Sequence, residues 1–335
     1  MREFARVSQQ VAALFEQAAR PESQARYDPE LWRYYPQLKT PQGCAQETRY
    51  VYDLCRLARF DPEGRCVLDV GCGFGLQLIV LHFMGAREAI GFDISEGRLR
   101  TFQRLVADFN LQGLQAQLAS LEEVDYEPAS FDMILSNEAI SHYPDVDEFL
   151  KRAARWLKRG GALIIADGNN AANSQLAAYT RQIWLRFENG PAGEFKGHTI
   201  LKPYVEQRAE IIQQAYPDLP AATVQVLAQR TSLMTRLTIL QAVERYLKTG
   251  ELPNSLYDPT QCPVNPYSGA VIERLFHPLE LARHIERFGF RARAYAYFGG
   301  AGGNPAVRLA NALLMRLTPL SLRWAKSFRV VAIRQ

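Results

Sequence analysis

The stretch Val67-Leu68-Asp69-Val70-Gly71-Cys72-Gly73-Phe74-Gly75 decides the fold of this 335-residue chain. Residues 66–70 form a short aliphatic run that is typical of a buried parallel strand, and residues 76–84 predict a helix that ends at Gly85. The chain must reverse between them, because a side chain at Gly71 or Gly73 would require costly backbone angles and keep a ligand away from the main chain. A second predicted strand ends at Asp93, eighteen residues after Gly75. Together these elements predict a nucleotide-binding βαβ unit.

The spacing of the glycines separates the classes of nucleotide. Folds that bind NAD or flavin use G-x-G-x-x-G and place a pyrophosphate on the helix N-terminus, whereas this turn reads G-x-G-x-G and follows Asp69. A carboxylate would repel a pyrophosphate, but it would attract the cationic amino-acid end of S-adenosylmethionine (SAM). No Lys-Ser or Lys-Thr pair follows the glycines, so a P-loop is excluded. Asp93 lies where an acid can accept hydrogen bonds from both ribose hydroxyls.

The chain resembles the class I SAM-dependent methyltransferases from about residue 47 to residue 170, and again near its C-terminus. Residues 67–75 resemble the first motif of that family, residues 91–95 its second, and residues 131–143 its fourth-strand motif. The resemblance implies an α/β fold with a doubly wound, mostly parallel seven-stranded sheet whose last strand is antiparallel. It also implies SAM as the cofactor, with S-adenosylhomocysteine as the product.

The resemblance further implies which residues contact the cofactor. Asp69 and the glycine turn would place the methionine moiety, and Asp93 would hold the ribose. Ile94 and Leu121 would flank the adenine, with Ser120 near its amino edge. The full set of expected cofactor-binding residues is Asp69, Gly71, Cys72, Gly73, Gly75, Asp93, Ile94, Ser120, Leu121 and Asn137.

Four segments can be distinguished along the chain. We expect an N-terminal helical cap in residues 1–60, the SAM-binding Rossmann-like core in 61–170, a large helical insertion after the fifth strand in 171–276, and the C-terminal part of the core with a terminal strand hairpin in 277–335. Within the insertion, helical periodicity runs through residues 176–187, 205–215 and 224–247. The insertion fits a lid that encloses a specific acceptor, and it also fits a stabilising cap or a dimer surface.

Two other segments allow two interpretations each. The aromatic cluster Tyr27, Trp32, Tyr34 and Tyr35 fits core packing of the cap or stacking on substrate or adenine. The segment 304–327, which follows the glycine-rich residues 299–303, combines leucines with arginines. It fits a helix packed on the sheet edge or against a second copy in a homodimer. It also fits a helix that contacts a membrane surface or a lipid-linked substrate.

Composition narrows the class of protein. The chain is 47% apolar and 22% charged, as is ordinary for globular proteins, and its formal charge of +4 gives no clear signal for nucleic acid. Its five cysteines show no paired spacing, so we expect free thiols rather than disulfides or a zinc site. The sequence has no apolar run long enough to span a membrane, and residues 1–6 lack the apolar region of a secretion signal. These features predict a cytoplasmic protein.

The candidates for acceptor chemistry follow the fourth and fifth strands. Methyl transfer depends mainly on placing the acceptor in line with the leaving sulfur, and a hydroxyl acceptor also needs a base. His142 is the candidate base, although it fits a structural histidine as well. Asn169, Asn170 and Tyr204 are candidates for binding the acceptor, and turn formation also explains the two asparagines.

The segment 138–142 is similar to the E-x-x-E-H pattern with which ubiquinone-type O-methyltransferases and small-RNA 2′-O-methyltransferases hold a divalent ion. Glu138 and His142 match this pattern, but Ser141 stands where the second acid belongs. Loss of a charged oxygen ligand weakens such a site, so no metal is expected.

These observations predict a SAM-dependent methyltransferase that acts on a small-molecule acceptor, with a hydroxyl oxygen favoured. Within enzymes, the alternative is an RNA or protein methyltransferase, which would present a contiguous basic surface. Outside enzymes, the alternative is a SAM-binding regulatory or scaffold protein without turnover.

Overall fold

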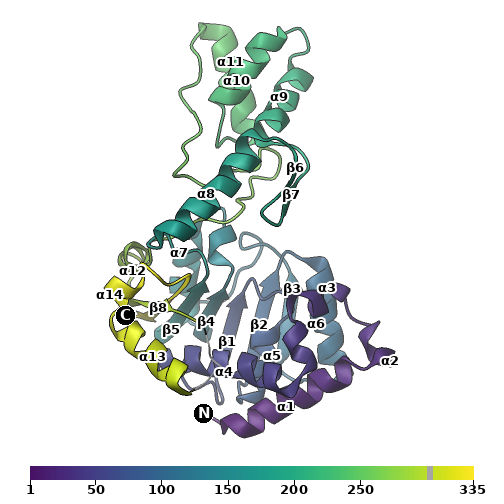
Figure 1. Ribbon diagram of the computed structural model, residues 1–335, viewed down its shortest axis with the longest axis vertical. Coiled ribbons are helices and arrows are strands. Elements are labelled where there is room, and N and C mark those ends of the chain that lie inside the picture. Colours follow the sequence, from purple (N-terminus) through teal and green to yellow (C-terminus); the bar gives the residue numbers. More distant parts are fainter. Residues whose placement is uncertain (300–304) are drawn as a thin grey trace. The chain divides into compact units, whose positions relative to one another are not determined.

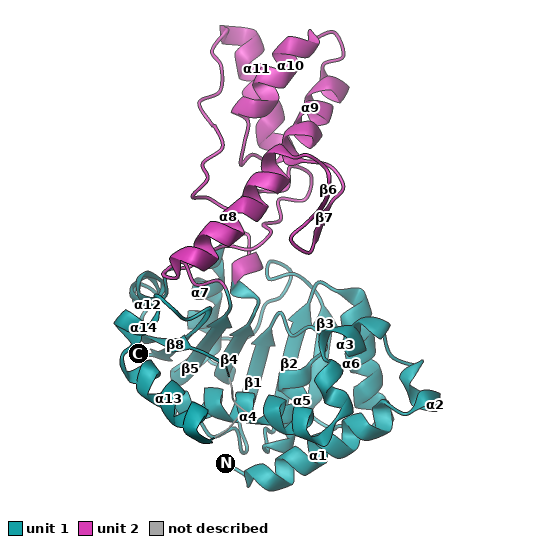
Figure 2. Ribbon diagram, viewed as in Figure 1, with its two compact units in different colours: residues 1–140, 145–168, 277–335 teal, residues 141–144, 169–276 magenta. Residues whose placement is uncertain are grey.

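The computed structural model describes residues 1–299 and 305–335. They form two compact units, which Figure 2 colours separately. Unit 1 comprises residues 1–140, 145–168 and 277–335, and unit 2 comprises residues 141–144 and 169–276. Residues 300–303 of the glycine-rich run, and Asn304 at the start of the leucine-arginine segment, lie outside the described residues.

Unit 1 is built on a seven-stranded sheet (Figure 1). Its strands are β1 (Cys66–Val70), β2 (Glu88–Asp93), β3 (Leu114–Leu118), β4 (Phe131–Asn137), β5 (Leu157–Asp167), β8 (Phe290–Tyr297) and β9 (Ser327–Arg334). They lie in the order β3-β2-β1-β4-β5-β9-β8. Strands β1 to β5 pair in parallel, whereas β9 runs antiparallel to both β5 and β8. The predicted fold class, a mostly parallel seven-stranded sheet with an antiparallel last strand, is confirmed.

One face of this sheet is covered by helices from the first third of the chain. They are α1 (Phe4–Ala18), α4 (Pro41–Leu57), α5 (Leu76–Phe83) and α6 (Glu96–Asp108), and α1 is joined to α4 through α2 (Pro21–Gln24), α3 (Pro29–Tyr34) and the 3-10 helix η1 (Pro36–Lys39). Buried side chains such as Val11, Val51 and Phe102 form one apolar core with Leu135 and Ile164 of the sheet. Burial of its apolar side against this core holds each amphipathic helix in place.

Buried residues at alternate strand positions, such as Ile134, Ile165 and Val330, point to the opposite face of the sheet. Helices α7 (Val146–Trp156) and α12 (Pro278–Glu286) contact the strands β5, β8 and β9. Helices α13 (Pro305–Arg316) and α14 (Thr318–Ser321) lie between β8 and β9 in the chain and contact β8. The sheet is therefore a buried layer whose strand ends alone are available for a ligand.

Unit 2 contains four longer helices and a short hairpin. The helices are α8 (Ser174–Asn189), α9 (Tyr204–Ala215), α10 (Ala221–Arg230) and α11 (Arg236–Thr249), and the hairpin strands are β6 (Gly193–Phe195) and β7 (His198–Ile200). The helices α9, α10 and α11 share a small core that includes Ile212, Leu227 and Val243. The buried guanidinium of Arg208 lies 2.5 Å from the carboxylate of Glu188 and donates to the carbonyl of Ala228 at 2.7 Å.

The sequence-based expectation for residues 224–247 differs from the structure. A single helical stretch was expected, whereas the chain forms α10 and α11, separated at Leu233, which has a φ of 64°. Helix α11 has its own N-terminus, where the N-cap residue Thr235 forms a capping box with Thr238. Hydrophobic periodicity continued across this break, so periodicity alone could not reveal it.

The hairpin of β6 and β7 was not anticipated. Its two turn residues, Lys196 and Gly197, both have positive φ (50° and 82°), as a type I′ turn requires. Gly197 was the sequence signal for this turn. The strands on either side have only three residues each, which is too few to show an alternating pattern.

Among the described residues, no helix is long and apolar enough to cross a membrane. The five cysteines are free thiols, and Cys44, Cys55, Cys66 and Cys72 are buried.

Candidate active site

The glycine-rich turn joins β1 to α5 at the carboxyl edge of the sheet. Gly71, Gly73 and Gly75 have φ values of 77°, 53° and 68°, which L-residues with a side chain rarely adopt. A Cβ atom at Gly75 would lie 2.1 Å from the ring of Phe102, so this glycine is also required by packing. At Gly73 the nearest atom to such a Cβ is Arg98 Cδ at 4.0 Å, so the turn is open on that side.

Cys72, in the middle of the turn, directs its side chain inward. Its Sγ atom would lie 2.7 Å from a Cβ atom at Gly91, and burial raises the pKa of the thiol well above its ordinary value. The backbone N–H of Cys72 donates to the carbonyl of Phe92 at 3.1 Å. The thiol therefore packs β1 against β2.

Asp69 is the most unusual group near the turn. Its carboxyl group is only 1% exposed, and its Oδ1 atom has no hydrogen-bond partner among the residues that the structure describes. Burial, together with the nearby charge of Asp93, raises the pKa of Asp69 to about 8. A buried acceptor without a donor is costly unless a ligand supplies the donor.

Asp93 ends β2, and its carboxylate faces the glycine turn. Its Oδ2 atom accepts from the Gly73 amide at 2.8 Å, and its Oδ1 atom accepts from the Ser95 amide at 2.8 Å. These two bonds fix the orientation of the carboxylate and leave its remaining lone pairs for other donors. The next residue, Ile94, has a side chain that is 77% exposed, which is unusual for isoleucine.

The predicted adenine-flanking residues follow β3. Leu121 is buried, and the backbone N–H of Ser120 donates to Glu123 Oε2 at 2.8 Å. Ser120 is half-buried, and its turn is closed by this bond. Because β2 and β3 pair in parallel, residues 94, 120 and 121 all follow neighbouring strand ends at one edge of the sheet.

Tyr35, a member of the predicted aromatic cluster, lies close to Asp69, and Glu47, which the sequence analysis did not assign, lies close to Tyr35. The Tyr35 ring packs edge-on against Phe74 of the glycine turn at 6.3 Å. Burial raises the pKa of Tyr35 to about 12, with contributions from the charges of Glu47 and Asp69. Burial also raises the pKa of Glu47, whose Oε1 atom accepts from Gln37 Nε2 at 2.7 Å. The aromatic cluster is thus divided, because Tyr27 and Trp32 are core residues whereas Tyr35 meets the turn.

Asn137, at the end of β4, is the acceptor in a chain of hydrogen bonds on the same face of the sheet. Tyr50 of α4 donates from its hydroxyl to Asn137 Oδ1 at 2.5 Å, and Arg329 of β9 donates to that hydroxyl at 2.8 Å. The Arg329 guanidinium lies 3.9 Å from the ring centre of Tyr297. Tyr50 and Arg329 were not found from the sequence, because neither belongs to a motif. Arg329 lies beside β5 only because the register of β9 pairs it with Ala166.

Glu138 directly follows β4 and has a φ of 51°. Its Oε2 atom accepts from the backbone N–H of Gly168 at 2.9 Å, which links the ends of β4 and β5. Non-glycine residues in this conformation cost free energy and gather at functional sites.

His142 ends the 3-10 helix η2 (Ile140–His142), and its side chain is exposed. The backbone around it is held by Arg274. The Arg274 amide donates to Ser141 O at 2.8 Å, and its guanidinium donates to Tyr143 O at 2.5 Å and to Pro144 O at 2.7 Å. Sequence reasoning missed Arg274, because 132 residues separate it from His142.

The three predicted acceptor-binding residues belong to unit 2. Asn169 and Asn170 pair with Phe276, where the chain enters and leaves this unit, and Asn170 Oδ1 accepts from the Ala172 amide at 3.0 Å. The Asn170 side chain therefore stabilises a turn of the backbone. Tyr204 begins α9 and is buried against Phe187, with the ring centres 5.9 Å apart. Whether any of these side chains binds the acceptor stays a prediction.

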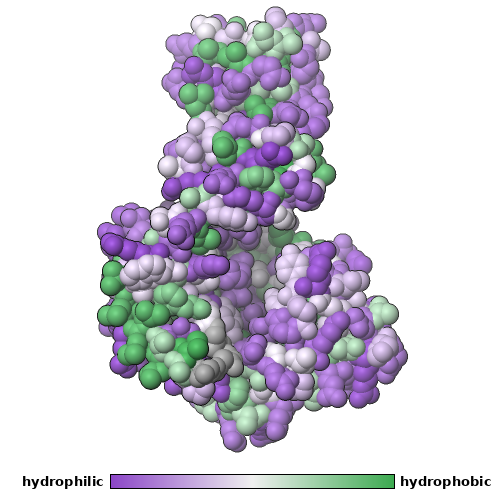
Figure 3. All heavy atoms as spheres, in the orientation of Figure 1, coloured by the Kyte–Doolittle hydropathy of each residue, from purple (hydrophilic) through white to green (hydrophobic). Residues whose placement is uncertain are grey.

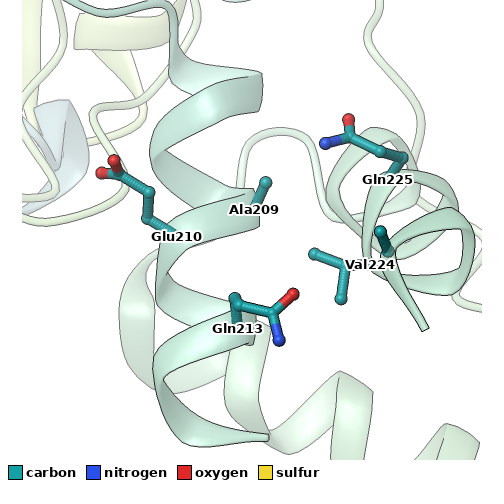
Figure 4. A pocket seen from close by; sticks show the side chains of 6 residues that line it. Ala209, Glu210, Gln213, Val224 and Gln225 are labelled. Atoms are coloured by element: carbon teal, nitrogen blue, oxygen red, sulfur yellow. The ribbon is translucent and has the colours of Figure 1, made fainter. Parts of the chain in front are cut away.

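Figure 4 shows a pocket of about 200 Å³ within unit 2, between α9 and α10. Its lining includes Ala209, Gln213 and Val224, and its carboxylate, Glu210, is paired with Lys202. This pocket therefore offers no reactive group. Within residues 1–299 and 305–335, no three His, Cys, Asp or Glu side chains come together in a way that could hold a metal ion.

Comparisons with known proteins agree with this geometry. Residues 68–165 match the family model described as "Methyltransferase domain". The chain is 36% identical to the ubiquinone biosynthesis O-methyltransferase of Bradyrhizobium diazoefficiens over 106 residues, which cover 32% of this chain and only 41% of that enzyme. It is 32% identical to the enzyme of the same name from Caulobacter vibrioides over 174 residues, which cover 46% of this chain and 67% of that enzyme.

Among solved structures, an S-adenosylmethionine dependent methyltransferase from Mesorhizobium loti matches with a TM-score of 0.45 and 17% identity, over 84% of this chain and 97% of that one. The family model matches the glycine-rich turn and strands β2 to β4, and the alignment with the Caulobacter relative spans two thirds of that enzyme. This chain therefore belongs to the class I SAM-dependent methyltransferases.

Proposed function

We propose that this methyltransferase acts on an oxygen atom of a small-molecule acceptor. The names of the ubiquinone O-methyltransferase relatives support oxygen as the acceptor atom. The chain spans less than half of the length of the first of these relatives, so their substrate is not transferred to it. The observation that supports the use of SAM in this site is the buried, unpartnered Oδ1 atom of Asp69.

The residues at the carboxyl edge fit SAM in their chemistry. A buried acid that lacks a donor suits the ammonium group of the methionine moiety, and the open side of Gly73 suits a close approach to the main chain. We propose that Asp69 and residues 71–75 hold that moiety and that Asp93 holds the ribose hydroxyls. Ile94, Ser120 and Leu121 would surround the adenine, and Asn137 would face the reacting end.

When bound, SAM would supply a methyl carbon that is activated by the positively charged sulfur. The acceptor oxygen would bond to this carbon as the sulfur leaves on the opposite side. The protein must then place the acceptor and remove the proton of its hydroxyl group. We propose that His142 takes this proton on a ring nitrogen. His142 lies five residues after Asn137, so their Cα atoms are at most about 18 Å apart along the chain.

The first experiment incubates the full chain with SAM carrying a labelled methyl group and with separate panels of phenols, amines, RNA and proteins. Label in the phenol panel is the expected result. Label confined to RNA or protein would replace the proposal with the corresponding macromolecular activity. Binding of SAM without transfer to any panel would indicate a regulatory or scaffold protein.

The second experiment tests His142. Replacement by alanine (H142A) is expected to reduce kcat by about 10²–10⁴-fold, the range typical of a lost general base, without changing the Kd of SAM. His198→Ala is the matched control, because His198 belongs to the β6–β7 hairpin and its ring packs on Phe187. An unchanged kcat for H142A would remove this histidine from the mechanism while leaving the cofactor site intact.

A further inference from the structure

The surface of α13 and α14 carries large apolar side chains that no part of the described chain covers. Six of them are each 47–64% exposed: Val307, Leu309, Leu313, Leu317, Leu320 and Trp324. Helix α13 has no buried residue at all. Figure 3 shows hydrophobic residues gathered over these two helices. We call these six residues the α13–α14 surface. Contiguous exposed apolar patches are uncommon and mark contact with a partner or a membrane.

The exposed leucines form a stripe set by helix geometry. Leu309 and Leu313 of α13 and Leu317, which directly follows that helix, are spaced four residues apart, so Leu309 and Leu313 lie on one side of α13 and Leu317 continues their line. The half-buried Asn311, Leu314 and Met315 lie on the other side of the helix, and α13 contacts β8. The stripe is therefore not the inward face of a poorly packed helix.

Two hydrogen bonds join the segment of α13 and α14 to β8 and to Gly299. Asn311 Nδ2 donates to the carbonyl of Gly299 at 2.6 Å, and the Ala296 amide of β8 donates to the hydroxyl of Thr318 at 3.1 Å. Ser321 and Leu322 are buried behind α14. The exposed stripe therefore lies on the outer side of a segment whose helices contact β8.

The segment that carries the stripe contains basic residues and no acid, and Asp53 of α4 lies close enough to Arg308 to feel its charge. Residues 287–335 contain nine basic residues and no acidic residue, although the whole chain has a formal charge of only +4. Arg308, Arg316, Arg323 and Lys326 are exposed within or beside the two helices. An apolar stripe flanked by cations, together with an exposed tryptophan, has the chemistry of a helix that lies in the interface of an anionic bilayer.

We propose that the α13–α14 surface docks on an anionic lipid bilayer, with the leucine stripe and Trp324 entering the headgroup region and the four basic side chains meeting lipid phosphates and carboxylates. A symmetric dimer through this surface would place the same basic residues against one another, with no acid in residues 287–335 to offset them. Charge complementarity therefore favours lipid over a second copy.

The experiment is co-sedimentation of the full chain with phosphatidylcholine vesicles that contain either no or 30% phosphatidylserine, at low and high salt. Binding is expected only to the serine-containing vesicles, and it should weaken as salt screens the charges. The triple variant Arg308→Gln, Arg316→Gln, Arg323→Gln should weaken vesicle binding by about fivefold for each charge removed. The control Arg33→Gln, Arg100→Gln, Arg245→Gln removes three exposed charges elsewhere and should bind as the unchanged chain does.

The stripe is tested separately. Leu309→Ser, Leu313→Ser, Leu317→Ser should abolish vesicle binding, whereas Leu237→Ser, Leu247→Ser, at exposed leucines of α11, should leave it unchanged. Light scattering gives the mass of each variant in parallel. Equal binding by both leucine variants, no binding to either vesicle, or a dimer that the stripe variant converts to a monomer would each overturn the proposal. None of these outcomes depends on methyl transfer.

Discussion

Arg329 and Tyr50 form a partly buried hydrogen-bonded pair whose donor and acceptor atoms are 2.8 Å apart, although they lie 279 residues apart in the sequence. The Arg329 side chain is only 3% exposed and, within the described part of the chain, has no carboxylate at ion-pair distance. Its charge is instead offset by the Tyr50 hydroxyl, the Phe328 carbonyl and the faces of two tyrosine rings. Tyr50 therefore joins a buried cation to the end of β4.

The first prediction concerns this pair. Tyr50→Phe should lower the free energy of unfolding by about 2–6 kcal/mol, because Arg329 and Asn137 each lose a hydrogen-bond partner, at about 1–3 kcal/mol apiece. Tyr52→Phe on the same helix removes one bond, to the Arg2 carbonyl, and should cost about 0.5–1.5 kcal/mol. Urea denaturation measures both. Equal losses of unfolding free energy in the two variants would mean that the two hydrogen bonds of Tyr50 stabilise the fold no more than the single bond of Tyr52.

The second prediction concerns the proton of Asp69. Because its pKa is raised from 3.8 to about 8, the carboxyl group of the ligand-free protein holds a proton at neutral pH and must release it to bind a cation. The affinity for SAM should therefore rise about tenfold per pH unit from pH 6 to about pH 7 and stop rising near pH 8, where the ammonium group of SAM loses its own proton. Calorimetry from pH 6 to pH 9 measures the profile. Asp69→Asn should bind more weakly and with no such rise.

The same proton has a consequence for stability that does not involve SAM. A raised pKa in the folded state means that the stabilising contribution of the neutral group is full below about pH 4 and is lost as pH rises towards 8. Asp69→Asn removes this ionisation, so the variant should be more stable than the unchanged chain at pH 8. A less stable variant would contradict the assignment.

The third prediction separates packing from backbone strain. Gly75→Ala combines a left-handed φ with a Cβ atom 2.1 Å from Phe102, whereas Gly160→Ala has a similar φ of 77° and no atom within 4 Å. Gly160→Ala should cost about 1–2 kcal/mol from strain alone. Gly75→Ala should cost a further 1–3 kcal/mol, roughly, from overpacking, as measured by urea denaturation. Similar costs for both would show that Phe102 can move aside.

The fourth prediction concerns the buried ion pair of unit 2. Glu188 and Arg208 are each 1% exposed, so Arg208→Met leaves a buried carboxylate without its partner. The expected cost is about 3–5 kcal/mol. The double variant Glu188→Gln, Arg208→Met should recover a large part of that loss, because no unpaired charge remains. Thermal unfolding compares the two, and a double variant no more stable than the single one would contradict this account.

The fifth prediction treats Arg274 as a positioning residue for His142. Arg274→Lys cannot bond both the Tyr143 and Pro144 carbonyls in the forked geometry of a guanidinium, so kcat should fall at least about tenfold while the KM for SAM stays the same. In the H142A background, the same change should cause little further loss of rate. A full loss in that background would mean that Arg274 acts independently of His142.

Local sequence signals were sufficient for the parallel part of the fold, whereas the cofactor contacts assigned to its strand ends stay a prediction. The aliphatic run before Gly71 and the position of Asp93 predicted β1, the turn and β2, because each of these depends on residues close together in the chain. Residues such as Tyr50, Glu47 and Arg329 could not be found in this way. They meet only through the packing of α4 on the sheet and the register of β9, which no short window of sequence contains.

The position of β9 has a consequence for synthesis. Strand β5 ends at Asp167, but its second neighbour is formed by residues 327–334, so about 160 residues must be made while one side of β5 has no partner. During that time the nascent chain exposes a flat, apolar strand edge, which is the kind of edge that recruits strands of other chains. Slow translation, or a substitution that prevents β9 from pairing, should therefore cause aggregation before it affects any catalytic step.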